Sequence, residues 1–155
     1  MWPEQTMPPA ISVPYSPRVR KPDLNLSSVF ANFYGYHCLV LERDGASGYA
    51  GQWVAPTTIV RMCEEPRYAA LRALHEKAGI WGKITSGPHI EEKIRSRKNG
   101  SRRIIYHYFT AYSLDVVGLG SHEKEWFKAD QIHAHEDNNI AECVPRLMEE
   151  MGLFQ

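Results

Sequence analysis

The segment between Glu64 and Gly79 constrains the fold most, because it carries the signals of an amphipathic helix from start to end. Pro66 suits the first turn, where a missing N–H costs nothing. Apolar residues then recur at the spacing of one helical face: Ala70, Leu71, Leu74 and Ala78. Gly79 is expected to end the helix in the left-handed conformation that glycine tolerates best. The sequence therefore predicts one well-defined helix in the middle of the chain.

Segments rich in β-forming residues lie on both sides of this helix. They predict strands at 36–43, 52–55, 84–94 and 103–114, and a short one at 126–127; the third is broken near Gly87-Pro88. Asn99-Gly100 predicts a hairpin between two of the strands. A last helix is expected over 137–151, where Pro145 either kinks it or marks its start. This order of elements predicts an α/β (α+β) chain.

The beginning of the chain differs in composition from the rest. Six of the ten prolines lie in the first 22 residues, and proline neither donates to a strand nor fits inside a helix. Residues 1–33 are therefore expected to form an extended arm. A disordered tail and a cleavable targeting peptide are the alternatives. If a partner surface holds the arm, the residues expected to contact it are Pro8, Pro14, Arg18, Arg20 and Lys21.

The composition excludes several classes of protein. A length of 155 residues suits one domain. Lys plus Arg and Asp plus Glu both count 18, so the formal net charge is zero and the totals do not indicate a strongly basic protein. No apolar run approaches the ~18 residues that span a bilayer, so no membrane contact is expected. The cysteines, Cys38, Cys63 and Cys143, form no C-x-x-C pattern, which favours a reducing compartment.

Isolated histidines and cysteines give little support for a reactive site. Among the histidines only His133 and His135 lie close in sequence, and no cysteine is near them, so they are expected to be surface residues. Cys63 precedes a helix, where a thiol can have a lowered pKa, but no base stands beside it in the sequence. A buried, unreactive Cys63 is expected, and no metal centre is expected at these residues.

Residues 58 to 80 carry the motif that is most informative about family. Glu64 is followed, after seven residues, by Arg72-Ala73-Leu74-His75-Glu76-Lys77-Ala78-Gly79-Ile80. This segment resembles the Nudix box, G-x5-E-x7-R-E-U-x-E-E-x-G-U, where U is aliphatic. Trp53-Val54-Ala55-Pro56 and Trp126-Phe127 resemble flanking features of the family. The resemblance implies an α/β/α sandwich over residues 34–155, with a mixed sheet, a Nudix-type helix and a C-terminal helix behind the N-terminal arm.

The departures from the box suggest a loss of activity. In the family, three glutamates of the R-E-U-x-E-E segment gather a divalent cation, and here these positions hold Ala73, Glu76 and Lys77. A lysine repels a dication, and at about 4 Å this repulsion costs kilocalories. Thr57, Thr58 and Cys63 stand where the family has glycines. We therefore expect a catalytically inactive domain with no cofactor, metal or small-molecule substrate, in which Glu64 and Arg72 pair structurally.

The expected hairpin is strongly basic. Six cations lie within eleven residues without an acid between them: Lys93, Arg95, Arg97, Lys98, Arg102 and Arg103. A basic β-ribbon suits a phosphate backbone, which predicts RNA binding. The alternative is a solvated hairpin whose charges prevent edge pairing.

Three functions follow from these observations. The first is a structural subunit that contacts ribosomal or other RNA and neighbouring proteins. Degenerate Nudix domains of similar outline occur in the large subunit of the mitochondrial ribosome, and this analogy implies a mitochondrial location. The second is a divergent metal-dependent hydrolase of a nucleoside diphosphate derivative. Its metal ligands would be Glu64, Glu65 and Glu76, and its base Glu91, Glu92 or Glu123. The third is a small-molecule sensor that kept the cleft and lost the chemistry.

Overall fold

A mixed sheet forms the centre of the molecule. The computed structural model describes residues 20–45, 48–98 and 100–154. Within these ranges seven strands form one sheet in the order β3-β2-β1-β6-β5, while β4 pairs with β1 and β7 with β2. The β1 and β6 strands run parallel, whereas the other pairs are antiparallel. The strands are β1 Arg20–Phe33, β2 Tyr36–Leu41, β3 Trp53–Val54, β4 Thr57–Ile59, β5 Gly82–Arg97, β6 Gly100–Ser113 and β7 Lys124–Phe127.

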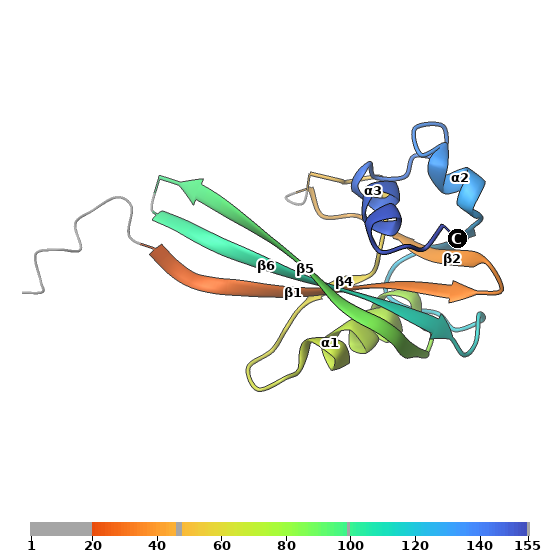
Figure 1. Ribbon diagram of the computed structural model, residues 1–155, viewed down its shortest axis with the longest axis horizontal. Coiled ribbons are helices and arrows are strands. Elements are labelled where there is room, and N and C mark those ends of the chain that lie inside the picture. The colour runs from red at the N-terminus through yellow and green to blue at the C-terminus, as the bar shows by residue number, and fades with distance from the viewer. Residues whose placement is uncertain (1–19, 46–47, 99, 155) are drawn as a thin grey trace, which may run out of the picture.

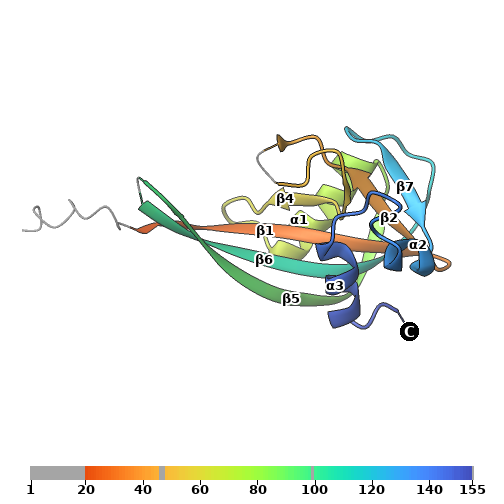
Figure 2. The ribbon, with the colours of Figure 1, turned by 90° about the horizontal axis from the view of Figure 1, so that it is seen from above.

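Helices cover both faces of this sheet. The α1 helix, Pro66–Ala73, continues directly into a π-helical turn, η4, Leu74–Ala78. The α2 helix spans Ala129–His133 and α3 spans Cys143–Glu150. Figures 1 and 2 show α1 against one face of the sheet, with α3 and α2 on the other side. The predicted α/β/α sandwich with a mixed sheet, a central helix and a C-terminal helix is confirmed.

The alternation of side chains in β1 divides the core into two layers. Val29 and Ala31 pack on the α1 side with Leu74. Phe30 points to the opposite face and packs with Leu147 and the rest of the α3 side. Burying one such side chain fully contributes roughly 1.5–3 kcal/mol. The central strand therefore stabilises both helical layers at once.

The predicted boundary between arm and domain at residues 33 and 34 is wrong. Residues 20–33 of the predicted arm form β1, which lies inside the sheet between β2 and β6. Pro22 is accommodated because the β1–β6 register shifts between Lys21 and Leu24, where the proline cannot donate to the ladder. Arg20 and Lys21 belong to this strand. Pro8, Pro14 and Arg18 lie outside the described residues.

Three further elements differ from the prediction. The last helix begins at Cys143, not at residue 137, and Pro145 occupies its first turn, where no N–H is needed. The short α2 helix was not predicted. The β5 strand continues through the cis Gly87–Pro88 bond with only a register shift.

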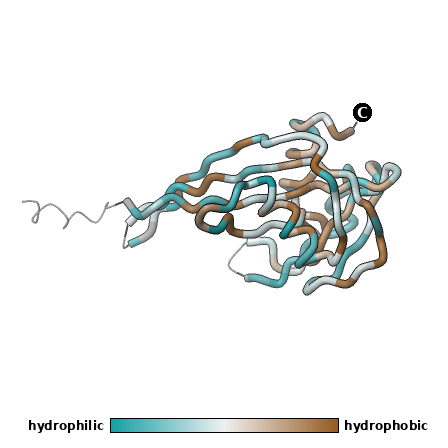
Figure 3. Tube along the Cα trace, turned by 90° about the horizontal axis from the view of Figure 1, so that it is seen from below, coloured by the Kyte–Doolittle hydropathy of each residue, from teal (hydrophilic) through white to brown (hydrophobic). Residues whose placement is uncertain are grey.

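One end of the sheet extends beyond the helical layers. Figures 1 and 2 show β1, β5 and β6 projecting together as a long ribbon. Figure 3 shows that the tip of this ribbon is mainly hydrophilic, whereas apolar segments gather in the body. In the described part of the chain, no helix is long and apolar enough to cross a membrane.

Candidate active site

Arg72 connects the helix, the preceding loop and β4. Its Nε donates to Glu64 Oε2 at 3.0 Å, and one terminal nitrogen donates to Glu64 Oε1 at 2.9 Å and to the Ile59 carbonyl at 2.8 Å. The other terminal nitrogen lies 3.2 Å from Glu76 Oε1 and 3.4 Å from Thr58 Oγ1. The predicted pairing of Arg72 with Glu64 is therefore present.

Glu64 is held as a carboxylate by this network. The Arg61 backbone N–H donates to the Glu64 Oε1 atom as well. The hydrogen bonds from Arg72, with the backbone bond from Arg61, lower the pKa of Glu64 to about 2. The loop that carries Glu64 turns at Cys63, which has a φ of 65° and is exposed, so the expected burial of its thiol is wrong.

The end of the central helix is closed by a second loop. Gly79 has a φ of 77°, as predicted for the helix end, and a Cβ there would also collide with the backbone of Leu119. The backbone N–H groups of Ser121 and His122 donate to the carbonyls of Glu76 and Lys77 at 2.8 and 3.0 Å. This loop brings His122 against the last turn of the helix.

A cavity of about 480 Å³ lies beside this helix end. The α3 helix supplies part of its apolar wall through Val144 and Leu147, and β1 supplies Leu24, Leu26 and Phe30. Tyr106 and Tyr108 of β6 also line it, with their rings stacked at 5.9 Å and an interplanar angle of 4°. The cavity thus offers a broad apolar and aromatic surface.

Charged and titratable side chains complete the lining: Glu42, Asp44, Lys77, Arg95 and His122. Burial, and then the charge of Lys77, lower the pKa of His122, so its imidazole is neutral at neutral pH. The Nδ1 atom of His122 lies 2.8 Å from Ser121 Oγ, which orients the ring. A neutral imidazole beside a lysine can accept a proton next to a bound anion.

The box residues do not fit a dication held as the resemblance implies. Of the three metal-gathering positions only Glu76 is a carboxylate, so two of the three ligands that the resemblance implies are missing. Ala73 is fully buried, and Lys77 brings a positive charge. Glu64 is engaged by Arg72 and Arg61, while Glu65 is exposed at the helix start. The box therefore lacks the ligand set for the metal that the resemblance implies.

The proposed bases of the hydrolase hypothesis are scattered. Glu91 is hydrogen-bonded to Arg146, and Glu92 to Arg103. Glu123 lines a shallower hollow with Lys124 and Trp53. Among the described residues around the main cavity, none of these three glutamates is present. His133 packs against Phe154 at 4.1 Å between ring centroids, away from the cavity.

The basic hairpin contains several cations with local partners. Arg103 pairs with Asp23 and Glu92, and Lys93 lies over the Tyr106 ring at 5.4 Å. Arg95 lines the cavity, while Lys98 is exposed and Arg102 half-buried. Arg97 ends β5. The hairpin and its basic residues are where the sequence predicts them, and its binding to RNA stays a prediction.

Sequence reasoning missed the residues that the cavity brings together. His122 is far from the box in sequence, and the backbone hydrogen bonds of Ser121 and His122 to the helix end place it there. The alternation of Tyr106 and Tyr108 was a usable signal, because side chains two apart in a strand share a face. Lys77 was interpreted only as a lost metal ligand.

Solved structures with the same fold support this architecture. A NUDIX hydrolase from Nitrosomonas europaea superimposes with a TM-score of 0.65 over 84% of this chain and 89% of that protein, at 14% identity. The MutT protein from Methanosarcina mazei gives a TM-score of 0.63 over 84% and 93% of the two chains, at 18% identity. These similarities establish the fold.

Two curated human proteins are related in sequence. Diphosphoinositol polyphosphate phosphohydrolase NUDT4B is 34% identical over 89 residues, which cover 55% of this chain and 48% of that protein. Diphosphoinositol polyphosphate phosphohydrolase 3-beta is 30% identical over 104 residues, covering 60% and 61%. The chain therefore spans about half to three-fifths of the length of these relatives.

These comparisons contradict the expectation of an inactive domain, which is therefore wrong. Both curated relatives are named phosphohydrolases, and nothing in the described residues shows inactivity. The losses at Ala73 and Lys77 remove family metal ligands, yet a cavity with ionisable groups remains beside them.

The family model of the NUDIX domain matches residues 27–147 of this chain. Because this match covers most of the sequence, the chain belongs to the NUDIX domain family.

Proposed function

We propose that this protein is a divergent hydrolase that cleaves a diphosphate linkage in a nucleoside diphosphate derivative. The observation that carries this proposal is the 480 Å³ cavity, which joins the end of the Nudix helix to a stacked pair of tyrosines. The names of the two curated relatives support hydrolysis of a phosphorylated substrate. The substrates of these relatives are not assigned to this chain, because it covers only part of the relatives' length.

The lining of the cavity favours a nucleoside over a highly phosphorylated ring. Tyr106 and Tyr108 give the cavity an aromatic wall against which a base can pack. The Lys and Arg residues of the lining are Lys77 and Arg95, and they are matched by Glu42 and Asp44. This balanced lining suits the few charges of a diphosphate better than the many charges of an inositol polyphosphate.

Three ionisable groups of the lining then have a role in the reaction: Lys77, Arg95 and His122. Lys77 and Arg95 contact phosphate oxygens, with Lys77 as a compact point charge. Neutral His122 accepts the proton of a water molecule whose oxygen attacks phosphorus, and the P–O bond of the diphosphate breaks. Lys77 stabilises the charge that develops on the phosphate oxygens during this step.

A turnover assay with a panel of substrates tests the proposal. Purified protein is incubated with nucleoside diphosphate derivatives, a dinucleoside polyphosphate and a diphosphoinositol polyphosphate, each with and without Mg²⁺ or Mn²⁺, and products are followed by phosphorus NMR. Preferred cleavage of a nucleoside diphosphate derivative supports the proposal. Preferred cleavage of the diphosphoinositol compound would replace the substrate class, and absence of turnover in every arm would overturn the function.

A further inference from the structure

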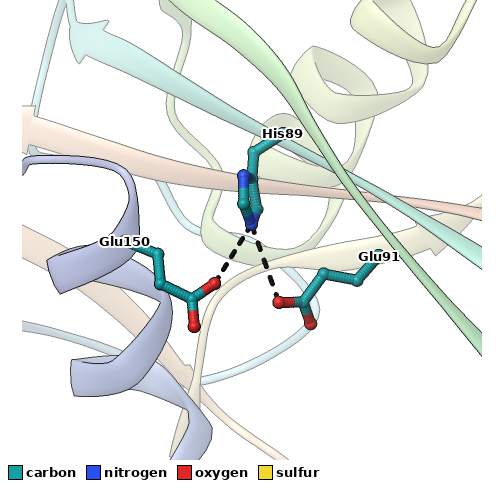
Figure 4. Close-up of side chains that lie close together, drawn as sticks. All are labelled: His89, Glu91 and Glu150. Atoms are coloured by element: carbon teal, nitrogen blue, oxygen red, sulfur yellow. Dashed lines mark ion pairs between the residues drawn. The ribbon is translucent and has the colours of Figure 1, made fainter.

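A second group of potential metal ligands lies outside the cavity lining. His89 and Glu91 come from β5, and Glu150 from the last residue of α3. Figure 4 shows the imidazole and both carboxylates converging on one point between strand and helix. One ligand atom from each residue lies within 4.8 Å of the other two. The three side chains are thus close enough to share one ion.

The His89 ring nitrogen is placed like a ligand. Its Nε2 atom lies 3.2 Å from Glu150 Oε1 and 3.6 Å from Glu91 Oε2. The same atom is shielded from solvent and faces these two carboxylates without a well-aligned hydrogen bond. A shielded imidazole nitrogen without a hydrogen bond costs free energy unless a proton or a metal ion satisfies it.

The net charge of the cluster favours a cation. Arg146 donates to both oxygens of Glu91 and to Glu150 Oε2, so it neutralises one of the two carboxylates. Glu150 Oε1 is directed at the His89 ring and not at Arg146. With a neutral imidazole the four side chains carry one net negative charge. Arg146 also fixes the orientation of both carboxylates, as outer partners do in metal sites.

We propose that His89, Glu91 and Glu150 form a site for a zinc-like divalent ion. One imidazole and two carboxylates, with an open fourth position, match the ligands that Zn²⁺ accepts. The nitrogen ligand disfavours Mg²⁺, which prefers oxygen ligands only. This site is separate from the Nudix helix, and it ties β5 to α3, whose Val144 and Leu147 line the cavity. Bound Zn²⁺ would hold that wall in place.

Calorimetric titration of the full chain with Zn²⁺, in buffer containing excess Mg²⁺, tests this site. One equivalent is expected to bind, and to raise the melting temperature, because a ligand that binds the folded state stabilises it. His89→Gln and Glu150→Gln should each weaken binding by about 100-fold or more, since loss of an outer partner alone costs up to about 100-fold. Glu149→Gln changes the neighbouring exposed glutamate and should bind normally.

Two results would overturn the proposal. One is the absence of one-to-one Zn²⁺ binding by the folded wild-type chain, which would leave the cluster as an ion-pair network around Arg146. The other is equal Zn²⁺ affinity in the wild type, His89→Gln and Glu150→Gln, which would place the ion elsewhere. A circular dichroism spectrum of each variant separates a lost ligand from a lost fold. The outcome is independent of hydrolase activity.

Discussion

The Arg72 guanidinium and the Glu64 carboxylate meet through two hydrogen bonds, of 3.0 and 2.9 Å, across a separation of eight residues. Both side chains are 17% exposed, so solvent screens this pair only partly. The pair joins the loop after β4 to the Nudix helix. It is therefore a structural element of the site.

Replacing Arg72 by methionine should destabilise the fold. The substitution leaves the Glu64 carboxylate with only its bond from the Arg61 amide, and losing hydrogen bonds to a charged group costs about 1.5–3 kcal/mol. Urea denaturation at neutral pH measures the difference in free energy of unfolding. Arg67→Met, at an exposed position of the same helix, is the control and should unfold like the wild type.

The effect of Arg72→Met should also depend on pH. The folded-state pKa of Glu64 is lowered from 4.5 to about 2, so its contribution to stability is complete above 4.5 and declines as the pH falls towards 2. The difference between wild type and variant should therefore shrink over that range. A difference that stays constant down to acidic pH would contradict the assigned pairing.

Gly79→Ala should lower the free energy of unfolding for two reasons. A control variant, Gly35→Ala, separates these two contributions. The residue has a φ of 77°, and a Cβ would collide with the backbone of Leu119. The left-handed conformation alone costs about 1–2 kcal/mol for a residue with a side chain. Gly35 has a φ of 85° but open space around it, so Gly35→Ala measures the backbone cost alone. Equal destabilisation by both substitutions would show that the 118–120 loop does not press on the helix end.

Lys77→Met should weaken turnover of the diphosphate substrate. Loss of a hydrogen bond to a charged group costs about 1.5–3 kcal/mol, which corresponds to about 10- to 100-fold in kcat/KM. Lys83→Met, at an exposed lysine outside the cavity lining, is the matched control and should keep wild-type kinetics. Lys77→Glu restores the charge that the family has at this position. If Lys77→Glu gained Mg²⁺-dependent turnover and Lys77→Met kept wild-type turnover, Lys77 would not bind substrate.

His122→Asn should reduce kcat by about 10²- to 10⁴-fold, as expected for removal of a general base. Burial and Lys77 lower the pKa of His122 below 6.5, so its neutral, proton-accepting form persists below that pH. The acidic limb of the wild-type profile of kcat/KM against pH should thus lie below pH 6.5. This limb should be absent in the variant. His133→Asn, at a histidine packed on Phe154, serves as the control. An unchanged pH profile in His122→Asn would exclude the assigned role.

The sequence predicted those elements whose local signals agree with their environment. The helix ending at Gly79, the basic hairpin and the strand at Trp126 all form as expected. The β1 strand was missed because Pro22 outweighed the alternation of Leu24 and Leu26, although a register shift lets the sheet accept the proline. The last helix was placed too early, although one of the two roles considered for Pro145, marking the helix start, is the one that the structure has.

The site was harder to predict than the fold. Glu64 and Arg72 were recognisable from the box spacing, and their pairing follows from it. The cavity, however, draws on the end of β2, the helix end, β6 and α3, and no local pattern joins these segments. The expectation that the chain is inactive rested on the lost glutamates, the charge of Lys77 and the replaced glycines, all of which concern the box and not the lining of the cavity. The predicted mitochondrial location, the ribosomal partners and RNA binding stay predictions.

If the cavity between the Nudix helix end and the stacked tyrosines is the substrate site of a hydrolase, changes to its lining must reduce turnover. The most direct test is phosphorus NMR of one nucleoside diphosphate derivative with wild-type protein, Lys77→Met, His122→Asn and the Lys83→Met control, with divalent cations present. Cleavage of the diphosphate is expected with the wild type and the control, and strongly reduced cleavage with the two cavity variants. No cleavage by folded wild-type protein, or equal cleavage by all four proteins, would contradict this role of the cavity.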